Sequence, residues 1–154
     1  MKVRQAELRD LIFLQDMMIK LLNHLKVCGQ WALTDNQIDL ENGVVGFILS
    51  KMHMEGSIVL VSVEKDDIPN GLLIGWMLDY PKFYKYQRIA ELQFLYPLNF
   101  DRTPDLNKAF ETWGREQGAQ AFSNYATPDN EISIKVMERA GRRLAYHHFF
   151  KEVS

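Results

Sequence analysis

The sequence lacks the features that are typical of disulfide-bonded, membrane-spanning, nucleic-acid-binding and zinc-binding proteins. Its single cysteine, Cys28, cannot form a disulfide within the chain, which suits a reducing cytoplasm. The apolar run from Leu11 to Leu25 is interrupted by polar residues, so we expect no membrane span. The formal net charge of −2 gives no excess of positive charge for nucleic acid. The four histidines lack zinc-ligand spacing, alone or with Cys28, and we expect no metal.

What is present fits one globular domain over residues 1–154. A chain of 154 residues is too short for two units that each bury a core. Hydrophobic residues make up 47% of it and aromatic residues 12%, which favours a packed interior over disorder. We therefore expect a single cytoplasmic domain.

The spacing of apolar residues predicts ten elements in the order β-α-α-β-β-β-α-β-α-β. The expected strands are residues 2–6, 57–63, 72–80, 88–96, 121–125 and 143–153. The expected helices lie around residues 12–25, 40–48, 106–117 and 132–140. Three consecutive strands followed by strand–helix alternation imply an α/β (α+β) fold, with a mixed sheet of about six strands and four helices on both faces.

Punctuating residues predict where these elements begin and end. Asp10 can cap the first helix, because its carboxylate can accept from free amides of the first turn. Gly118 and Gly141 can end the last two helices in a left-handed conformation. The pair Asn70-Gly71 predicts a turn with positive φ between the second and third strands.

The closing segment carries the most specific motif, Asn130, Ser133, Met137 and Gly141 at intervals of three, four and four residues. This spacing resembles the Asn, Ala, Tyr, Gly series of the GCN5-related N-acetyltransferase (GNAT) family. The element order agrees with it, as do three further stretches, Val3–Ala6, Ala90–Phe94 and Trp113–Ala119. The resemblance covers nearly the whole chain. A helix reading Phe-Glu-x-Trp also resembles that of short acetyltransferase-like proteins of bacteriophages and bacteria. If the protein is encoded by a phage, the virion is a second expected location beside the cytoplasm.

The resemblance implies acetyl-coenzyme A as donor, held by a loop reading Gln/Arg-x-x-Gly-x-Gly/Ala before the third helix. Here those positions hold Leu98, Asp101 and Thr103, so neither glycine is present. A carboxylate about 5 Å from a phosphate costs roughly 3 kcal/mol at an effective dielectric near 20. The loop is therefore degenerate. The residues implied to contact the cofactor are Phe94, Leu95, Arg102, Thr103 and Asn130.

Acetyl transfer to an amine needs a base for the ammonium proton and an acid for the departing thiolate. The resemblance implies that Glu91 is the base, whereas a plain strand glutamate would pair with Arg88 or a nearby lysine. Met137 stands at the usual tyrosine position, and a thioether cannot donate a proton. Tyr125 and Tyr146 are the substitutes, although either can equally be a tyrosine at the edge of the core. Asn130 can equally be a helix cap.

Two functions of different classes follow. The first is an acetyl-coenzyme A-dependent N-acetyltransferase acting on an unidentified amine, with activity weakened by the degenerate loop. The second is a non-catalytic GNAT-fold protein that binds a protein partner or forms part of an assembly. The aromatic residues between 76 and 86 serve either as a wall of the acceptor pocket or as an interface anchor. The sequence is compatible with either a monomer or a homodimer.

Overall fold

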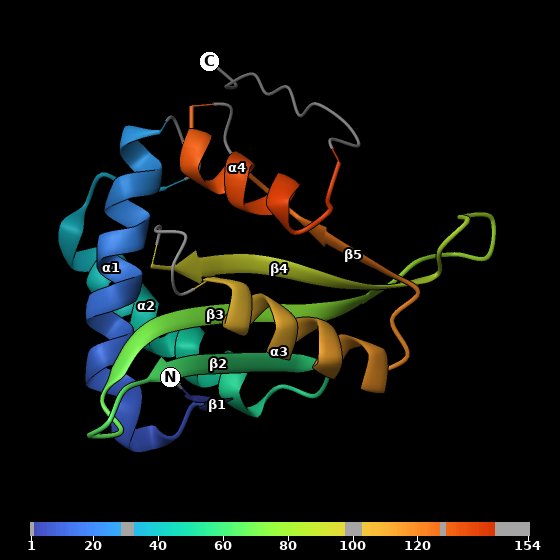
Figure 1. The fold of residues 1–154 in the computed structure, drawn as a ribbon. Helices are drawn as coiled ribbons and strands as arrows, with labels where there is room; N and C mark the ends of the chain where they lie inside the picture. The colour runs from blue at the N-terminus through green and yellow to red at the C-terminus, as the bar shows by residue number, and fades with distance from the viewer. Residues whose placement is uncertain (1, 29–32, 98–102, 127–128, 144–154) are drawn as a thin grey trace, which may run out of the picture.

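The computed structural model describes residues 2–28, 33–97, 103–126 and 129–143 (Figure 1). The elements are β1 (Lys2–Gln5), a 3-10 turn η1 (Leu8–Asp10), α1 (Leu11–Val27), α2 (Gln37–His53), β2 (Ser57–Val63), β3 (Pro69–Asp79), β4 (Arg88–Tyr96), α3 (Thr103–Glu116), β5 (Ala121–Asn124) and α4 (Glu131–Arg139). The expected element order is confirmed as far as α4. The sixth strand, expected over residues 143–153, lies outside the described residues except for Arg143, which is not in a strand.

The described strands form one mixed sheet in the order β1-β2-β3-β4-β5. The first three pairings are antiparallel and the last, between β4 and β5, is parallel. A parallel pair needs a crossover connection, and α3 supplies it. The expectation of a mixed sheet is thus confirmed, and its parallel pair is β4 with β5.

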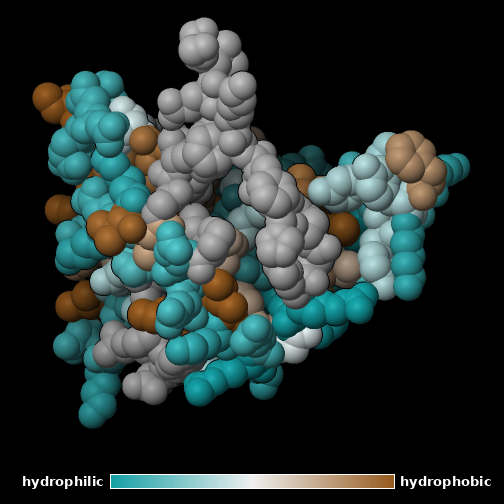
Figure 2. Space-filling view, turned by 90° about the horizontal axis from the view of Figure 1, so that it is seen from above, coloured by the Kyte–Doolittle hydropathy of each residue, from teal (hydrophilic) through white to brown (hydrophobic). Residues whose placement is uncertain are grey.

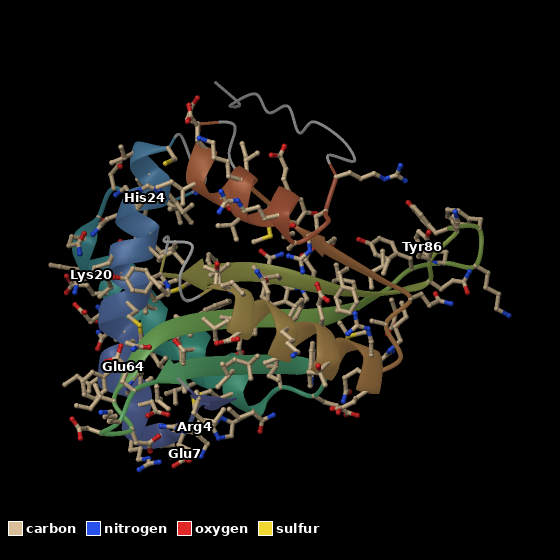
Figure 3. All side chains as sticks on the ribbon, in the orientation of Figure 1. Arg4, Glu7, Lys20, His24, Glu64 and Tyr86 are labelled. Atoms are coloured by element: carbon tan, nitrogen blue, oxygen red, sulfur yellow. The ribbon has the colours of Figure 1, made fainter. Side chains whose placement is uncertain are left out.

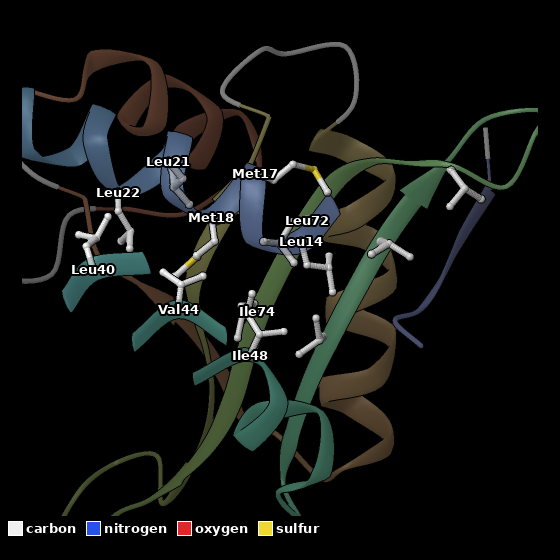
Figure 4. Close-up of a cluster of buried hydrophobic side chains, with 13 residues drawn as sticks. Leu14, Met17, Met18, Leu21, Leu22, Leu40, Val44, Ile48, Leu72 and Ile74 are labelled. Atoms are coloured by element: carbon white, nitrogen blue, oxygen red, sulfur yellow. The ribbon is translucent and has the colours of Figure 1, made fainter. Parts of the chain in front are cut away.

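Helices cover both faces of the sheet. α1 and α2 pack on one face through a cluster that includes Leu14, Met18, Val44, Ile48 and Ile74 (Figure 4). α3 and α4 lie on the other face, where their buried residues meet a second cluster from β2, β3 and β4 (Figure 1). The two clusters draw on alternate residues of each strand, as the period of two requires. The site described below lies between these two layers.

The first helix begins differently from the sequence prediction. Asp10 precedes α1, but its side chain makes no cap bond to that helix. Its carboxylate accepts instead from the guanidinium of Arg4, at 2.7 and 3.0 Å, and from the backbone amide of Glu7 at 2.7 Å. Arg4 and Glu7 lie close together at this corner of the fold (Figure 3). The prediction that Asp10 caps α1 is wrong because Arg4 from β1 binds the same carboxylate.

Glycines end two helices as expected, with φ of +80° at Gly118 and +78° at Gly141. The Asn70-Gly71 prediction is wrong, because both residues lie in β3 and the positive φ of the turn falls on Asp67, at 57°. Gly71 has another reason to be glycine. A Cβ there would collide with the hydroxyl of Ser62 on the neighbouring strand.

The hairpin between β3 and β4 projects from the body of the fold, at the right of Figures 1 and 2. Phe83 on it is 84% exposed, and its ring centroid lies 4.9 Å from that of Tyr84. Tyr84 in turn lies 5.1 Å from the ring of Tyr80. The aromatic residues of this hairpin therefore pack mainly on one another. Within the described residues, no helix is long and apolar enough to cross a membrane.

Candidate active site

The site forms where β4 and β5 stop pairing. The parallel ladder runs from Ile89 opposite Ala121 to Leu92 opposite Asn124. β5 ends there, whereas β4 continues to Tyr96, and the two strands diverge toward α4 (Figure 1). The edge of β4 that faces β5 consequently has no β5 partner over residues 93–96.

A bulge in β4 lies at the same point. On the β3 side, Ile74 pairs with Phe94 but the next residue, Gly75, pairs with Leu92, so Gln93 is the extra residue. A bulge leaves its extra residue outside the regular ladder and redirects the neighbouring side chains. Here it turns Gln93 toward Glu91, and the two side chains are hydrogen-bonded, with the Gln93 amide donating to the Glu91 carboxylate.

Glu91 is buried, at 4% exposure, and its carboxylate gathers the polar side chains of both strands. Besides Gln93, the hydroxyl of Ser123 donates to it at 3.4 Å, and the hydroxyl of Tyr125 also bonds to it. The structure thus brings together two of the three predicted catalytic residues, Glu91 and Tyr125. Tyr146 lies outside the described residues.

The surroundings of Glu91 raise the pKa of its carboxyl group. Burial is the main cause, and the hydrogen bonds from Gln93, Ser123 and Tyr125 partly oppose it. Among the described residues, no lysine or arginine forms an ion pair with Glu91. Arg88 pairs instead with Asp79 at 2.8 Å. The plain pairing with Arg88 that the sequence left open is therefore not what the structure shows. A buried carboxyl group with a raised pKa is suited to take up a proton near neutral pH.

An aromatic wall lies on the same face of the sheet as Glu91. Trp76 is directly opposite Glu91 in the β3–β4 ladder. Phe47 of α2 packs edge-on against Trp76 and Phe94, with centroids 6.4 and 5.6 Å away. The ammonium of Lys51 lies 4.1 Å from the centre of the Trp76 ring, a cation–π contact. The wall thus carries an alkylammonium group on the ring of Trp76, the residue opposite Glu91 in the ladder.

The aromatic residues that the sequence grouped together are therefore divided. Trp76 belongs to the wall near Glu91, whereas Tyr84 and its neighbours lie on the projecting hairpin. Tyr86 is likewise seen on that hairpin, away from α4 (Figure 3). Phe94, predicted to contact the cofactor, packs on the wall side of the sheet.

A small hollow of about 20 Å³ lies on the opposite face, between the end of β4 and the first turns of α3 and α4. Its lining includes Leu95 and Thr103, two of the residues predicted to contact the cofactor. Asn130 sits beside it at the start of α4, where its side chain accepts from the amide of Ser133 at 3.1 Å. The helix-cap reading of Asn130 is thus observed. Arg102 lies outside the described residues.

Sequence reasoning missed one buried cation, Arg142. It follows the glycine that ends α4, and its guanidinium donates to the sulfur of Met137 at 2.8 Å. Its side chain is only 11% exposed and lies 3.7 Å from the carboxylate of Glu111 on α3. A signal was available, because the second residue beyond a helix that ends in a left-handed glycine commonly packs back on the helix. Met137 itself is a core residue, at 6% exposure.

Other features of the described residues lie away from this site. A wider, open hollow of about 530 Å³ runs between α3 and the strands β1 and β2, lined by residues that include Leu60 and Trp113. It contains none of the residues around Glu91. No group of three His, Cys, Asp or Glu side chains that could hold a metal ion occurs in the part of the chain that the structure describes.

The comparisons with known proteins rest on structure. No protein-family model matches the chain, and no curated protein matches its sequence. A probable acetyltransferase is 18% identical, over 100% of this chain and 99% of that one, with a TM-score of 0.75. An aminoglycoside N-acetyltransferase, AAC(6')-Iy, solved with coenzyme A, is 16% identical over 99% and 93%, with a TM-score of 0.77. A transcriptional regulator from Bacillus halodurans is 12% identical over 99% of both chains, with a TM-score of 0.76.

Proposed function

For a chain that has the GNAT fold, we propose the function of an acetyl-coenzyme A-dependent N-acetyltransferase acting on a primary amine. One observation carries the proposal. Glu91 is a buried carboxylate without an ion-pair partner among the described residues, and it lies where β4 and β5 diverge. A glutamate with only a structural role in a strand would be exposed or paired with a cation, because burying an unpaired carboxylate is costly.

The donor would enter on the face of α3 and α4. The edge of β4 over residues 93–96 can pair with an extended chain that carries amide groups, which describes the pantetheine arm. Leu95 and Thr103 would line its path, and the start of α3 at Thr103 would face the diphosphate, with Arg102 and Asn130 as further contacts. A hollow of about 20 Å³ holds about one water, so α4 has to move away from β4 to admit the arm.

The acceptor would enter on the other face, along the aromatic wall. The contact of the Lys51 ammonium with the Trp76 ring supports a site for a primary alkylammonium there. Glu91 would take one proton from the acceptor ammonium, which frees the lone pair of the nitrogen to bond with the acetyl carbon. Tyr125, through its hydrogen bond to Glu91, would keep the carboxylate in place and link it to water, since Tyr125 is 49% exposed.

A second function is favoured by a different observation. Met137 stands where the resemblance implies a proton donor, and the hollow beside α4 is small. Both fit a GNAT-fold protein that binds a partner without turnover, and a fold does not fix a function. In that case the exposed aromatic residues of the hairpin, Phe83 above all, are the surface to examine for the partner.

Binding and turnover together test the proposal. Acetyl-coenzyme A at about 100 times its dissociation constant should stabilise the protein by about 2.7 kcal/mol. For a chain of this length that is a rise in Tm of roughly 5–10 °C. Release of the free thiol should then be followed with a panel of primary amines that includes aminoglycosides, polyamines and lysine peptides.

Glu91→Gln keeps the size of the side chain and removes the base, so turnover should fall by about a hundredfold or more while donor binding persists. Glu138→Gln, which alters an exposed glutamate of α4, is the matched control. If acetyl-coenzyme A gives no thermal shift and no amine is acetylated, the result supports the non-catalytic partner-binding function instead. Turnover that survives Glu91→Gln unchanged would remove Glu91 from the reaction.

A further inference from the structure

The side chain of Arg142 is held in the interior by the way α4 ends. The amide of Gly141 donates to the carbonyl of Glu138 at 2.9 Å, and the amide of Arg142 donates to the carbonyl of Met137 at 3.0 Å. These two hydrogen bonds, together with a left-handed glycine, form a Schellman motif, in which the residue after the glycine packs against the helix. That residue is normally apolar. Here it is an arginine, and its guanidinium reaches the sulfur of Met137.

The guanidinium is poorly satisfied where it lies. Its Nε and Nη2 atoms are buried and have no hydrogen-bond partner within the described part of the chain. The third nitrogen donates to a thioether, which is a weak acceptor. Among the described residues, Glu111 is the one carboxylate that forms an ion pair with Arg142, and it also pairs with Arg115 at 3.2 Å. Burial lowers the pKa of Arg142, and Glu111 only partly opposes this.

Stability does not explain such an arginine. A buried charge with weak partners costs free energy, and an apolar side chain of similar volume is often equally stable or better. The surroundings favour an apolar residue, since Met137 belongs to a cluster with Leu92, Phe110 and Val136. A buried cation with two free donors is instead prepared for an anion that the resting protein lacks.

The position of Arg142 matches the place where the proposed reaction produces an anion. Met137 and Leu92 belong to one buried cluster, and Leu92 is the last residue of β4 that pairs with β5. Glu111 lies eight residues into α3, about 12 Å along the helix from Thr103, where the diphosphate is expected. The guanidinium reaches the sulfur of Met137, the position where the resemblance implies the group that meets the departing thiolate. It lies on the α3 and α4 side of the sheet, opposite the side that carries Glu91.

We propose that Arg142 stabilises the thiolate that leaves acetyl-coenzyme A, in place of a proton donor at Met137. The proposal rests on the proposed function. Glu91 takes one proton from the ammonium, and the nitrogen lone pair forms the C–N bond. The C–S bond breaks and its electron pair stays on sulfur, where Arg142 binds the negative charge. The second proton on nitrogen passes to water, and the thiolate later takes a proton from water. The guanidinium keeps its own protons throughout, as its basicity requires.

The test measures the thiol pKa of bound coenzyme A, which needs no acceptor. Thiolate absorbs in the ultraviolet, so bound coenzyme A can be titrated on the wild type, Arg142→Met, Arg142→Lys and the control Arg143→Met. A neighbouring arginine lowers the pKa of a thiol. Arg142→Met should therefore reduce the thiolate fraction at least tenfold at a given pH below the pKa. Arg142→Lys should restore part of the thiolate fraction. Arg143→Met, which changes the exposed neighbouring residue, should leave the thiolate fraction at the wild-type value.

Each outcome decides. The same thiol pKa on the wild type and on Arg142→Met overturns the role of Arg142 and leaves the proposed function standing. A wild type that does not bind coenzyme A by calorimetry overturns both. Thermal unfolding separates a structural role, because we expect Arg142→Met to be as stable as the wild type or more so. If Arg142→Met does not fold, the neutral variant Arg142→Gln replaces it in the titration, and a pKa equal to that of the wild type again contradicts the proposal.

Discussion

The pH dependence of stability offers a direct test of Glu91, and Glu91→Gln is the change that isolates it. Folding raises the pKa of this carboxyl group above its ordinary value of 4.5, mainly through burial. Below that ordinary value the group is protonated in both the folded and the unfolded chain, so it carries no ionisation penalty. As the pH rises through the folded pKa, the buried group ionises at a cost and the wild type loses stability. Glutamine at position 91 has no proton to lose.

The magnitude follows from linkage. Between the unfolded and the folded pKa, the wild type should lose stability relative to Glu91→Gln by about 1.4 kcal/mol per pH unit. At the acidic end the variant should be the weaker of the two. One of the two carboxyl oxygens, which accept from Gln93 and Ser123, is replaced by an NH2 group that cannot accept, and a lost hydrogen bond costs roughly 0.5–1.5 kcal/mol. The two stability curves are therefore expected to converge or cross as the pH rises.

The assay is urea unfolding followed by circular dichroism, from about pH 4 to about pH 8. Glu138→Gln serves as the matched control and should run parallel to the wild type, because that glutamate is exposed. A constant difference between Glu91→Gln and the wild type at every pH would refute the argument, since it would mean that folding does not change the pKa of Glu91. Tyr125→Phe extends the test. This variant lacks a hydrogen bond that lowers the pKa of Glu91. Its loss of stability with rising pH should therefore continue to a higher pH than in the wild type.

Two further predictions concern the residues around Glu91. Lys51→Met vacates the face of Trp76, so the KM for a primary amine should fall if the acceptor uses that face, and steady-state kinetics would show an unchanged KM if it does not. Gly75→Ala should destabilise the protein by about 1–3 kcal/mol in urea unfolding. Its Cβ would collide with the ring of Phe110 and lie 2.8 Å from the carbonyl oxygen of Glu91. Gly46→Ala, with open space at its Cβ, should instead be neutral or stabilising.

Much of the fold is predictable because its signals are local. The strand Arg88–Tyr96 has the same limits in the sequence prediction and in the structure. Gly118 and Gly141 end their helices because glycine takes a positive φ at no steric cost. The failures occur where a distant residue competes. Arg4 of β1 binds the carboxylate of Asp10, so a helix cap that is sound on local grounds does not form.

The site is predictable in part. The resemblance selects Glu91, and its alternation within β4 places it on the opposite face from Leu92. The contacts that set the pKa and the orientation of the Glu91 carboxylate are not local in sequence. The bulge at Gln93 and the parallel partner Ser123 both depend on strand pairing, which one sequence does not reveal. Arg142 was overlooked because an arginine after a helix-ending glycine is usually a surface residue, and only the packing shows it to be buried.

Under the proposed function, donor binding and the chemical step would depend on different residues. Without glycines at positions 101 and 103, the loop would bind the donor diphosphate more weakly, and to the same extent in the ground state and the transition state. Loss of such uniform binding raises KM and leaves kcat unchanged. In the proposed reaction, Glu91 and Arg142 would act instead on charges that develop during the reaction, from opposite faces of the sheet near the end of the β4–β5 ladder. A degenerate loop is therefore compatible with a working catalytic centre, one that requires a high concentration of acetyl-coenzyme A.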